Sequence, residues 1–129
     1  MKILASTTLA SMLALTTPAA SAAPADSAEL LHRCTALEKS MGSIKLTSGE
    51  ALDAMWCMGY ISGLLDGFSI SDFRIGETPA ACPPDVAISR TQALGIIMTW
   101  LREHPDDLDK SGRRSAIIAL TKAFPCNKQ

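Results

Sequence analysis

Charge of one sign is not in excess in this sequence of 129 residues, which has 12 basic and 13 acidic side chains and a formal net charge of −1. Proteins that bind nucleic acid normally show a basic patch, so this balance argues against a nucleic-acid partner. The sequence also has no Lys/Arg-rich amphipathic segment of the kind that lies on a membrane surface. Composition therefore indicates a small globular domain and excludes these two classes of partner.

The usual motifs of catalytic and metal-binding sites are also missing. The sequence has no C-x-x-C pair and no haem-attachment motif, and its two histidines, His32 and His104, lie far apart. No serine lies in a G-x-S-x-G context. The acids at 106, 107 and 109 lack the ligand spacing and the glycine of an EF-hand. We therefore expect no enzymatic activity, no catalytic residue, no metal site and no cofactor.

A long apolar run occurs at the N-terminus. Met1 and Lys2 form a short basic start, residues 3–15 are apolar apart from Ser and Thr, and Ala20-Ser21-Ala22 is an A-x-A cleavage pattern. The run is shorter than the roughly 18–20 residues that span a bilayer. We predict a secretory signal peptide over residues 1–22 and a periplasmic domain over residues 23–129, free of the membrane after cleavage.

Three N-capping patterns divide the remaining chain into helices. At 26–29, 47–50 and 89–92 an Asp, Thr or Ser precedes a Glu or Gln by three residues. Gly42 is expected to end the first helix in the left-handed conformation. Pro105 is expected to begin a fourth helix that runs to about Phe124. The patterns predict an all-α fold of four helices.

The second predicted helix, from residue 51 to about residue 68, is apolar and has three glycines at a spacing of four: Gly59, Gly63 and Gly67. Each mid-helix glycine costs about 1 kcal/mol relative to alanine, so we expect a neighbouring helix backbone to approach closely. No charge lies between Asp53 and Asp66, which predicts a central, mostly buried helix. Asp66 is expected to accept hydrogen bonds from loop amides, with direct contact to a partner as the alternative.

A long irregular segment over residues 69–88 separates the second and third predicted helices. It contains Gly76, Pro79, Pro83 and Pro84. Loops longer than about 12–15 residues are uncommon in compact domains and are often functional. This segment is therefore the first candidate for a binding site.

Four cysteines allow three pairings. A helical hairpin that turns near Ile44 places Cys34 and Cys57 about 10 and 13 residues from the turn, at nearly the same height along the two helices. Cys82 and Cys126 lie just outside the open ends of the third and fourth helices. We predict the bonds Cys34–Cys57 and Cys82–Cys126, with the other two pairings as alternatives.

Several short motifs follow one another in a recognisable order. They are Cys57-Met58-Gly59-Tyr60-Ile61-Ser62-Gly63 with Asp66 three residues on, Cys82-Pro83-Pro84, Gln92, Trp100-Leu101-Arg102-Glu103-His104-Pro105, Ala119-Leu120 and Phe124-Pro125-Cys126. In this order, from about Cys34 to Cys126, the chain resembles the Rap/Tai family of type VI secretion immunity proteins. The matched residues outside the cysteines look architectural: Gly59, Tyr60, Gly63, Asp66, Pro83, His104 and Pro105.

The resemblance implies a small periplasmic helical protein, commonly dimeric, that binds and blocks a peptidoglycan amidase with a protruding loop. Here that loop would be residues 69–88, with Asp72, Phe73 and Arg74 as its exposed recognition residues. An aromatic side chain beside an arginine suits a binding hot spot, although Phe73 could instead fold back into the core. The resemblance thus implies an amidase inhibitor that is a possible homodimer.

A periplasmic stress or chaperone-like helical protein is the alternative function. Its size and its use of disulfides would be similar, and it should expose apolar surface when acidified. The order of the matched motifs favours the immunity protein.

Overall fold

The structure is a computed structural model that describes residues 25–72, 82 and 88–126, with the backbone alone for residues 69–72. These residues form four α-helices and one short 3-10 helix: α1 (Ser27–Met41), α2 (Ser48–Asp72), α3 (Arg90–Glu103), η1 (Pro105–Asp107) and α4 (Gly112–Ala123). Within the described residues the only strand-like pairing is an isolated bridge between Asp26 and Ser111. The all-α prediction is confirmed, while the predicted signal peptide lies outside the described residues.

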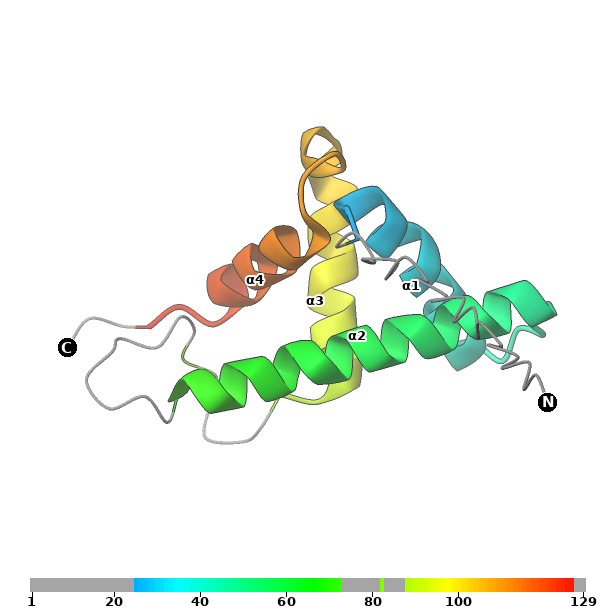
Figure 1. Ribbon diagram of the computed structural model, residues 1–129, viewed down its shortest axis with the longest axis horizontal. Helices are drawn as coiled ribbons and strands as arrows, with labels where there is room; N and C mark the ends of the chain where they lie inside the picture. The colour runs from blue at the N-terminus through cyan, green and yellow to red at the C-terminus, as the bar shows by residue number, and fades with distance from the viewer. Residues whose placement is uncertain (1–24, 73–81, 83–87, 127–129) are drawn as a thin grey trace, which may run out of the picture.

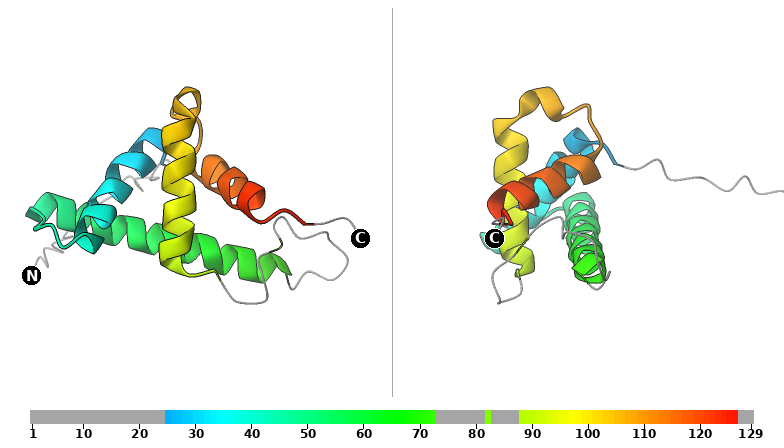
Figure 2. Two further views of the ribbon diagram at one scale, coloured as in Figure 1. Left: turned by 180° about the vertical axis from the view of Figure 1, so that it is seen from behind. Right: turned by 90° about the vertical axis from the view of Figure 1, so that its left-hand side faces the viewer.

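The helices are arranged around α1 and α3. In Figure 1, α2 runs along one side of the molecule, α1 and α4 are inclined to it, and α3 crosses behind it. α1 and α3 each pack against the other three α-helices, and α1 with α2 forms the most extensive pair. The side view in Figure 2 shows α2 at one edge, nearly end-on. The second helix is thus peripheral rather than central.

One hydrophobic core joins the four helices. Each helix contributes apolar residues at helical spacing, which gives it one buried stripe. The buried set is Leu30, Cys34, Ala36, Leu37, Ala54, Cys57, Ile61, Ala93, Leu94, Ile97, Met98, Leu101, Ala116, Ala119 and Leu120.

The three predicted N-caps are present. Asp26 Oδ1 accepts from the Glu29 amide at 2.7 Å, and Ser89 forms a complete capping box with Gln92. At the start of α2 the Glu50 amide donates to Thr47 Oγ1 at 3.3 Å, and the Thr47 amide donates to Glu50 Oε2 at 2.9 Å. Caps depend on residues three positions apart, so the sequence alone defines them.

The C-terminal ends of α1 and α2 differ from the predictions. Gly42 has φ −80° and is not left-handed; Ser43, with φ 62°, takes that conformation instead. The Gly42 amide still donates to the Glu38 and Lys39 carbonyls, so the turn occurs one residue later. α2 continues to Asp72 rather than ending near residue 68.

The start of α4 also differs from the prediction, because the loop before it forms backbone hydrogen bonds with the start of α1. Pro105 begins η1, and α4 begins only at Gly112. The carbonyls of Leu108 and Lys110 accept from the Ala28 and Ser27 amides at 3.0 and 2.8 Å. These carbonyls hold the start of α1 instead of accepting from the next helical turn.

The outer side of α2, opposite the core, is exposed, contrary to the prediction of a mostly buried helix. Leu52 and Met55 are 67% and 70% exposed. Gly59, Gly63 and Gly67 are exposed too, and a Cβ placed on any of them would meet no heavy atom within 4 Å beyond its chain neighbours and the adjacent backbone of its own helix. The predicted close approach of another helix to these glycines is therefore wrong. The fourth helix packs on α1 and α3 instead of over α2.

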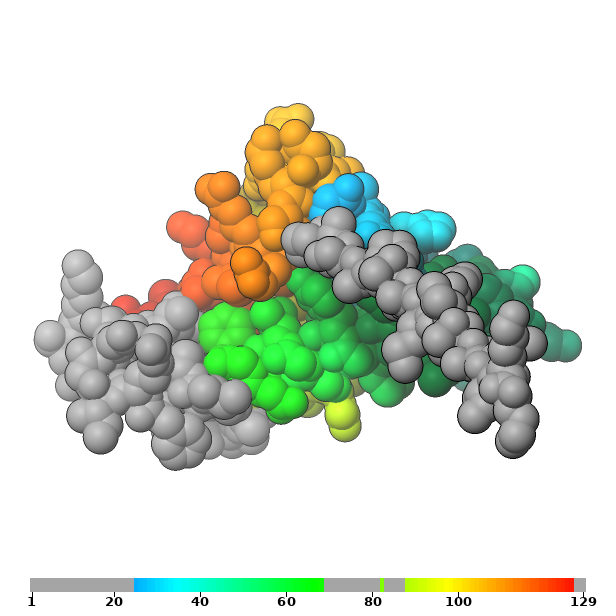
Figure 3. Space-filling view, viewed as in Figure 1, coloured from blue at the N-terminus to red at the C-terminus, as the bar shows by residue number. Residues whose placement is uncertain are grey.

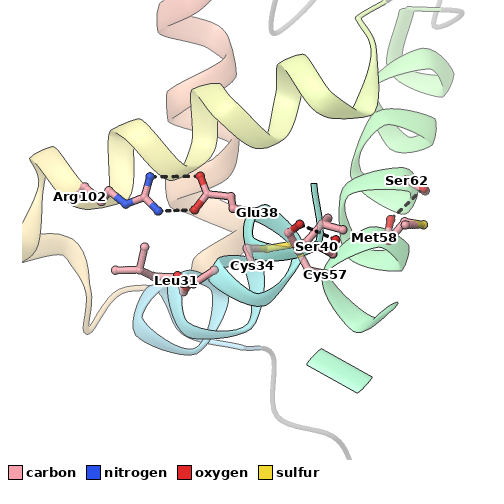
Figure 4. The surroundings of a disulfide bond; sticks show 10 residues. Leu31, Cys34, Glu38, Ser40, Cys57, Met58, Ser62 and Arg102 are labelled. Atoms are coloured by element: carbon pink, nitrogen blue, oxygen red, sulfur yellow. Dashed lines mark hydrogen bonds and ion pairs between the residues drawn. A yellow bond between two sulfur atoms is a disulfide. The ribbon is translucent and has the colours of Figure 1, made fainter. Parts of the chain in front are cut away.

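A buried disulfide joins α1 to α2. The Cys34 and Cys57 side chains are fully buried, and their Cα atoms are 5.1 Å apart. Figure 4 shows this bond beside the ion pair of Glu38 on α1 with Arg102 on α3. The predicted Cys34–Cys57 pairing is confirmed.

We expect replacement of both Cys34 and Cys57 by alanine to lower the free energy of unfolding by about 3 kcal/mol. The bond closes a loop with a sequence separation of 23, and loop-closure entropy gives this magnitude. Denaturant unfolding followed by circular dichroism measures the change. An unchanged unfolding midpoint would show that the bond contributes nothing to the stability of the hairpin.

A second prediction concerns Glu50, which binds Lys39 across the α1–α2 turn at 2.7 Å. The bond from Lys39, and after it the bonds from Thr47, lower the pKa of Glu50 from 4.5 to about 2. A carboxylate with a lowered folded-state pKa stabilises the fold above its unfolded pKa, and this stabilisation is lost as the pH falls towards the folded value.

We therefore expect Glu50→Gln to lower the urea midpoint near neutral pH, and the deficit to disappear between about pH 4.5 and pH 2. Urea titrations of both proteins across this range measure the difference. A deficit that stays constant down to the acid limit would contradict the role of the Glu50 charge.

Candidate partner-binding site

The predicted recognition segment joins the end of α2 to the start of α3. Asp72 is the last residue of α2 rather than part of the loop, so it marks the point where the segment leaves the helix. Phe73, Arg74 and Pro83 lie outside the described residues. The contacts that the structure describes are therefore those that attach the segment to the helices: at the end of α2, at Cys82 and at the start of α3.

The second disulfide attaches the segment at Cys82, towards its C-terminal end. Cys82 is bonded to Cys126, with a Cα–Cα distance of 4.8 Å, which confirms the predicted pairing. The Cys82 amide also donates to the Phe124 carbonyl at 3.0 Å. Cys82 is exposed and Cys126 is half-buried. The segment is thus tied to the chain that follows α4 by one covalent bond and one backbone hydrogen bond.

The end of the segment is fixed where α3 begins. The Ser89 capping box starts this helix, and Ile88 packs partly buried against the core. Arg90 donates through a guanidinium nitrogen to Ser62 Oγ on α2 at 3.2 Å, and the Ser62 hydroxyl donates to the Met58 carbonyl at 2.9 Å. These contacts hold the two helices that flank the segment against each other.

Two of the matched residues, His104 and Tyr60, pack against tryptophan rings. The His104 ring stacks on Trp100 with a centroid distance of 3.7 Å, and its Nδ1 lies 2.9 Å from the Trp100 carbonyl oxygen. Tyr60 stacks on Trp56 at 5.2 Å. Burial raises the pKa of Tyr60, partly opposed by Arg113, so the phenol is neutral at physiological pH. These contacts agree with an architectural role.

The carboxylates of the described residues are dispersed. Within the described part of the chain, no three His, Cys, Asp or Glu side chains lie together as metal ligands would. Asp66 is exposed, and its carboxylate forms no hydrogen bond with another described residue. The expected contact of Asp66 with loop amides is therefore not seen within the described residues.

An open groove between α3 and α4 was not foreseen from the sequence. Small side chains on the two helices, Gly95, Ala119 and Ala123, leave space beside Trp100. Glu103 and Lys122, of opposite charge, also line the groove. The sequence signal for the groove is the set of small residues Gly95, Ala119 and Ala123, which becomes informative only once α3 and α4 are known to be neighbours.

The fold and the attached segment define a class: a small all-helical protein, braced by two disulfides, one of which ties the chain between α2 and α3 to the chain after α4. The family model of the Rap1a immunity proteins matches residues 26–126, and the chain belongs to this family. Membership makes the protein an immunity protein, and the resemblance seen in the sequence is confirmed. No curated protein and no solved structure matches the chain.

No helix among the described residues has the length and the apolar character needed to cross a membrane.

We expect replacement of both Cys82 and Cys126 by serine to leave the helical content unchanged and to accelerate tryptic cleavage after Arg74. The bond closes a loop with a sequence separation of 44, so its loss lowers the free energy of unfolding by about 4 kcal/mol through loop-closure entropy. The helices should persist, because the bond lies outside the core and the Cys34–Cys57 bond still links α1 to α2. Circular dichroism and timed proteolysis with mass spectrometry measure both effects. Cleavage at the unaltered rate would show that the bond does not hold the segment.

Proposed function

We propose that this protein binds and inhibits a peptidoglycan amidase delivered by a type VI secretion system, acting in the periplasm as a homodimer. The segment of residues 69–88 enters the active-site cleft of the amidase and blocks it. The observation that carries the proposal is the match to the Rap1a immunity proteins across residues 26–126, which includes the whole of this segment.

The attachment of the segment supports inhibition by insertion. A binding loop that is ordered only on contact loses conformational entropy, which weakens binding. The Cys82–Cys126 bond and the Cys82–Phe124 backbone hydrogen bond restrict the segment before it meets a partner. Two disulfides also suit an oxidising compartment such as the periplasm, where the predicted signal peptide would deliver the chain.

An inhibitor of this kind acts through contact residues and needs no catalytic group of its own. Phe73 and Arg74 supply the residue types that are enriched at binding hot spots. Both follow directly on the end of α2, so a rigid helix leads into them.

The test is replacement of both Phe73 and Arg74 by alanine. We expect the inhibition constant against the amidase encoded beside this protein to rise by at least about 100-fold, since hot-spot residues each carry roughly 2 kcal/mol or more. Helical content should be unchanged, because neither residue belongs to a described helix.

Arg114→Ala, at an exposed position on α4, is the matched control and should inhibit like the parent protein. Full inhibition by the double variant would remove the segment from the proposed interface. Failure of the parent protein to inhibit would remove the amidase as the target.

A further inference from the structure

The two disulfides differ in how far solvent reaches them. Cys34 and Cys57 are fully buried in the core and link two packed helices. Cys82 is exposed, Cys126 is half-buried, and neither belongs to a described helix. In the space-filling view the end of α4 and the chain after it, drawn in red, lie at the surface (Figure 3). The Cys82–Cys126 bond is therefore open to attack from solution, whereas the Cys34–Cys57 bond is not.

Access decides which of the two disulfides reacts in the folded protein. A disulfide is broken by a thiolate that approaches one of its sulfur atoms, so the rate depends on access to that sulfur. The buried bond becomes accessible only when α1 and α2 separate, and this opening is rare because both helices contribute to the core. The Cys82–Cys126 bond needs no such opening. Reduction of the folded protein should therefore be confined to the bond that attaches the segment.

We propose that the Cys82–Cys126 bond is a thiol–disulfide exchange site, at which a dithiol breaks the bond in the folded protein and thereby weakens inhibition. The effect on inhibition rests on the proposed function, whereas the exchange itself does not. Without the bond, the attachment at Cys82 is reduced to the hydrogen bond from its amide to the Phe124 carbonyl. On binding the amidase, the segment then loses conformational entropy that the intact bond had already removed.

The exchange takes place in two steps. A thiolate of the dithiol attacks Sγ of the exposed Cys82, the bond between the two Sγ atoms breaks, and Cys126 Sγ leaves as a thiolate that takes up a proton. The second thiol of the dithiol then gives up its proton and attacks the reductant's own sulfur in this mixed disulfide, which releases Cys82 Sγ as a thiolate to be protonated in turn. Two electrons pass from the dithiol, which ends as a disulfide, to the two cysteines, which end as thiols.

The bond can form again without refolding. Phe124 is two residues before Cys126, so the hydrogen bond between the Cys82 amide and the Phe124 carbonyl favours conformations in which the two cysteines are close. Thiols held near each other have a high effective concentration, which favours renewed bond formation in an oxidising compartment. The exchange is therefore reversible and controls the attachment of the segment.

The experiment treats the mature, oxidised protein with dithiothreitol under native conditions, quenches samples with iodoacetamide at timed intervals, and locates the labelled cysteines by peptide mass spectrometry. We expect Cys82 and Cys126 to be labelled at least about 100-fold faster than Cys34 and Cys57, because the core bond reacts only through opening. Helical content should stay unchanged by circular dichroism, and tryptic cleavage after Arg74 should accelerate. The Cys34–Cys57 bond is the matched control within the same molecule.

Inhibition is measured with reduced protein that has been freed of dithiothreitol by anaerobic gel filtration, so that the amidase never meets the reductant. The reduced protein should have an inhibition constant at least about 10-fold higher than the oxidised protein, and reoxidation should restore the lower value. The variant with both Cys82→Ser and Cys126→Ser is the control, because its inhibition should not respond to the treatment.

Equal labelling rates for the two bonds, or earlier labelling of Cys34 and Cys57, would overturn the exchange site. Selective reduction that leaves tryptic cleavage unaltered would overturn its control of the segment, as would selective reduction that leaves the inhibition constant of an inhibitory parent protein unchanged. An oxidised parent protein that does not inhibit the amidase would instead remove the proposed function. The labelling and the cleavage need no amidase, so they still decide whether the bond is an exchange site that holds the segment.

Discussion

The packing of α1 against α2 around the Cys34–Cys57 bond is the constraint on which the rest of the structure depends. The bond is fully buried and links the two helices that share the most extensive contact. With α2 held by α1 on one side, α3 can cross both, and α4 then packs on α1 and α3. The same arrangement leaves one side of α2 exposed, and the C-terminal end of α2 leads into the predicted recognition segment.

Local features of this fold could be predicted from the sequence. The caps at Asp26, Thr47 and Ser89 each depend on a partner three residues away, so the sequence contains both members of the pair. Both disulfides could be favoured over the other two pairings as well. The rise of a helix places Cys34 and Cys57 at one height on either side of a turn, and Cys82 and Cys126 lie just outside the open ends of the last two helices. The family resemblance likewise rested on short motifs, each made of residues that are adjacent in the sequence, and on the order of these motifs along the chain.

Several of the predictions that were wrong concerned contacts between distant parts of the chain. Pro105 could begin a helix, but the carbonyls that would extend it bind the start of α1. The uncharged stretch between Asp53 and Asp66 suggested a buried helix. The sequence pattern of an apolar helix face is the same whether or not another helix of the chain covers that face, so the prediction could not distinguish the two cases. The groove beside Trp100 similarly requires knowledge of which helices are neighbours.

The central claim is that a helical scaffold fixed by two disulfides presents residues 69–88 to the active site of an amidase. The structure of the complex with the cognate amidase tests this most directly. The account predicts density for this segment inside the catalytic cleft, with the Cys82–Cys126 bond intact at its base. A complex in which the amidase binds the α3–α4 groove and leaves its own active site open would contradict it.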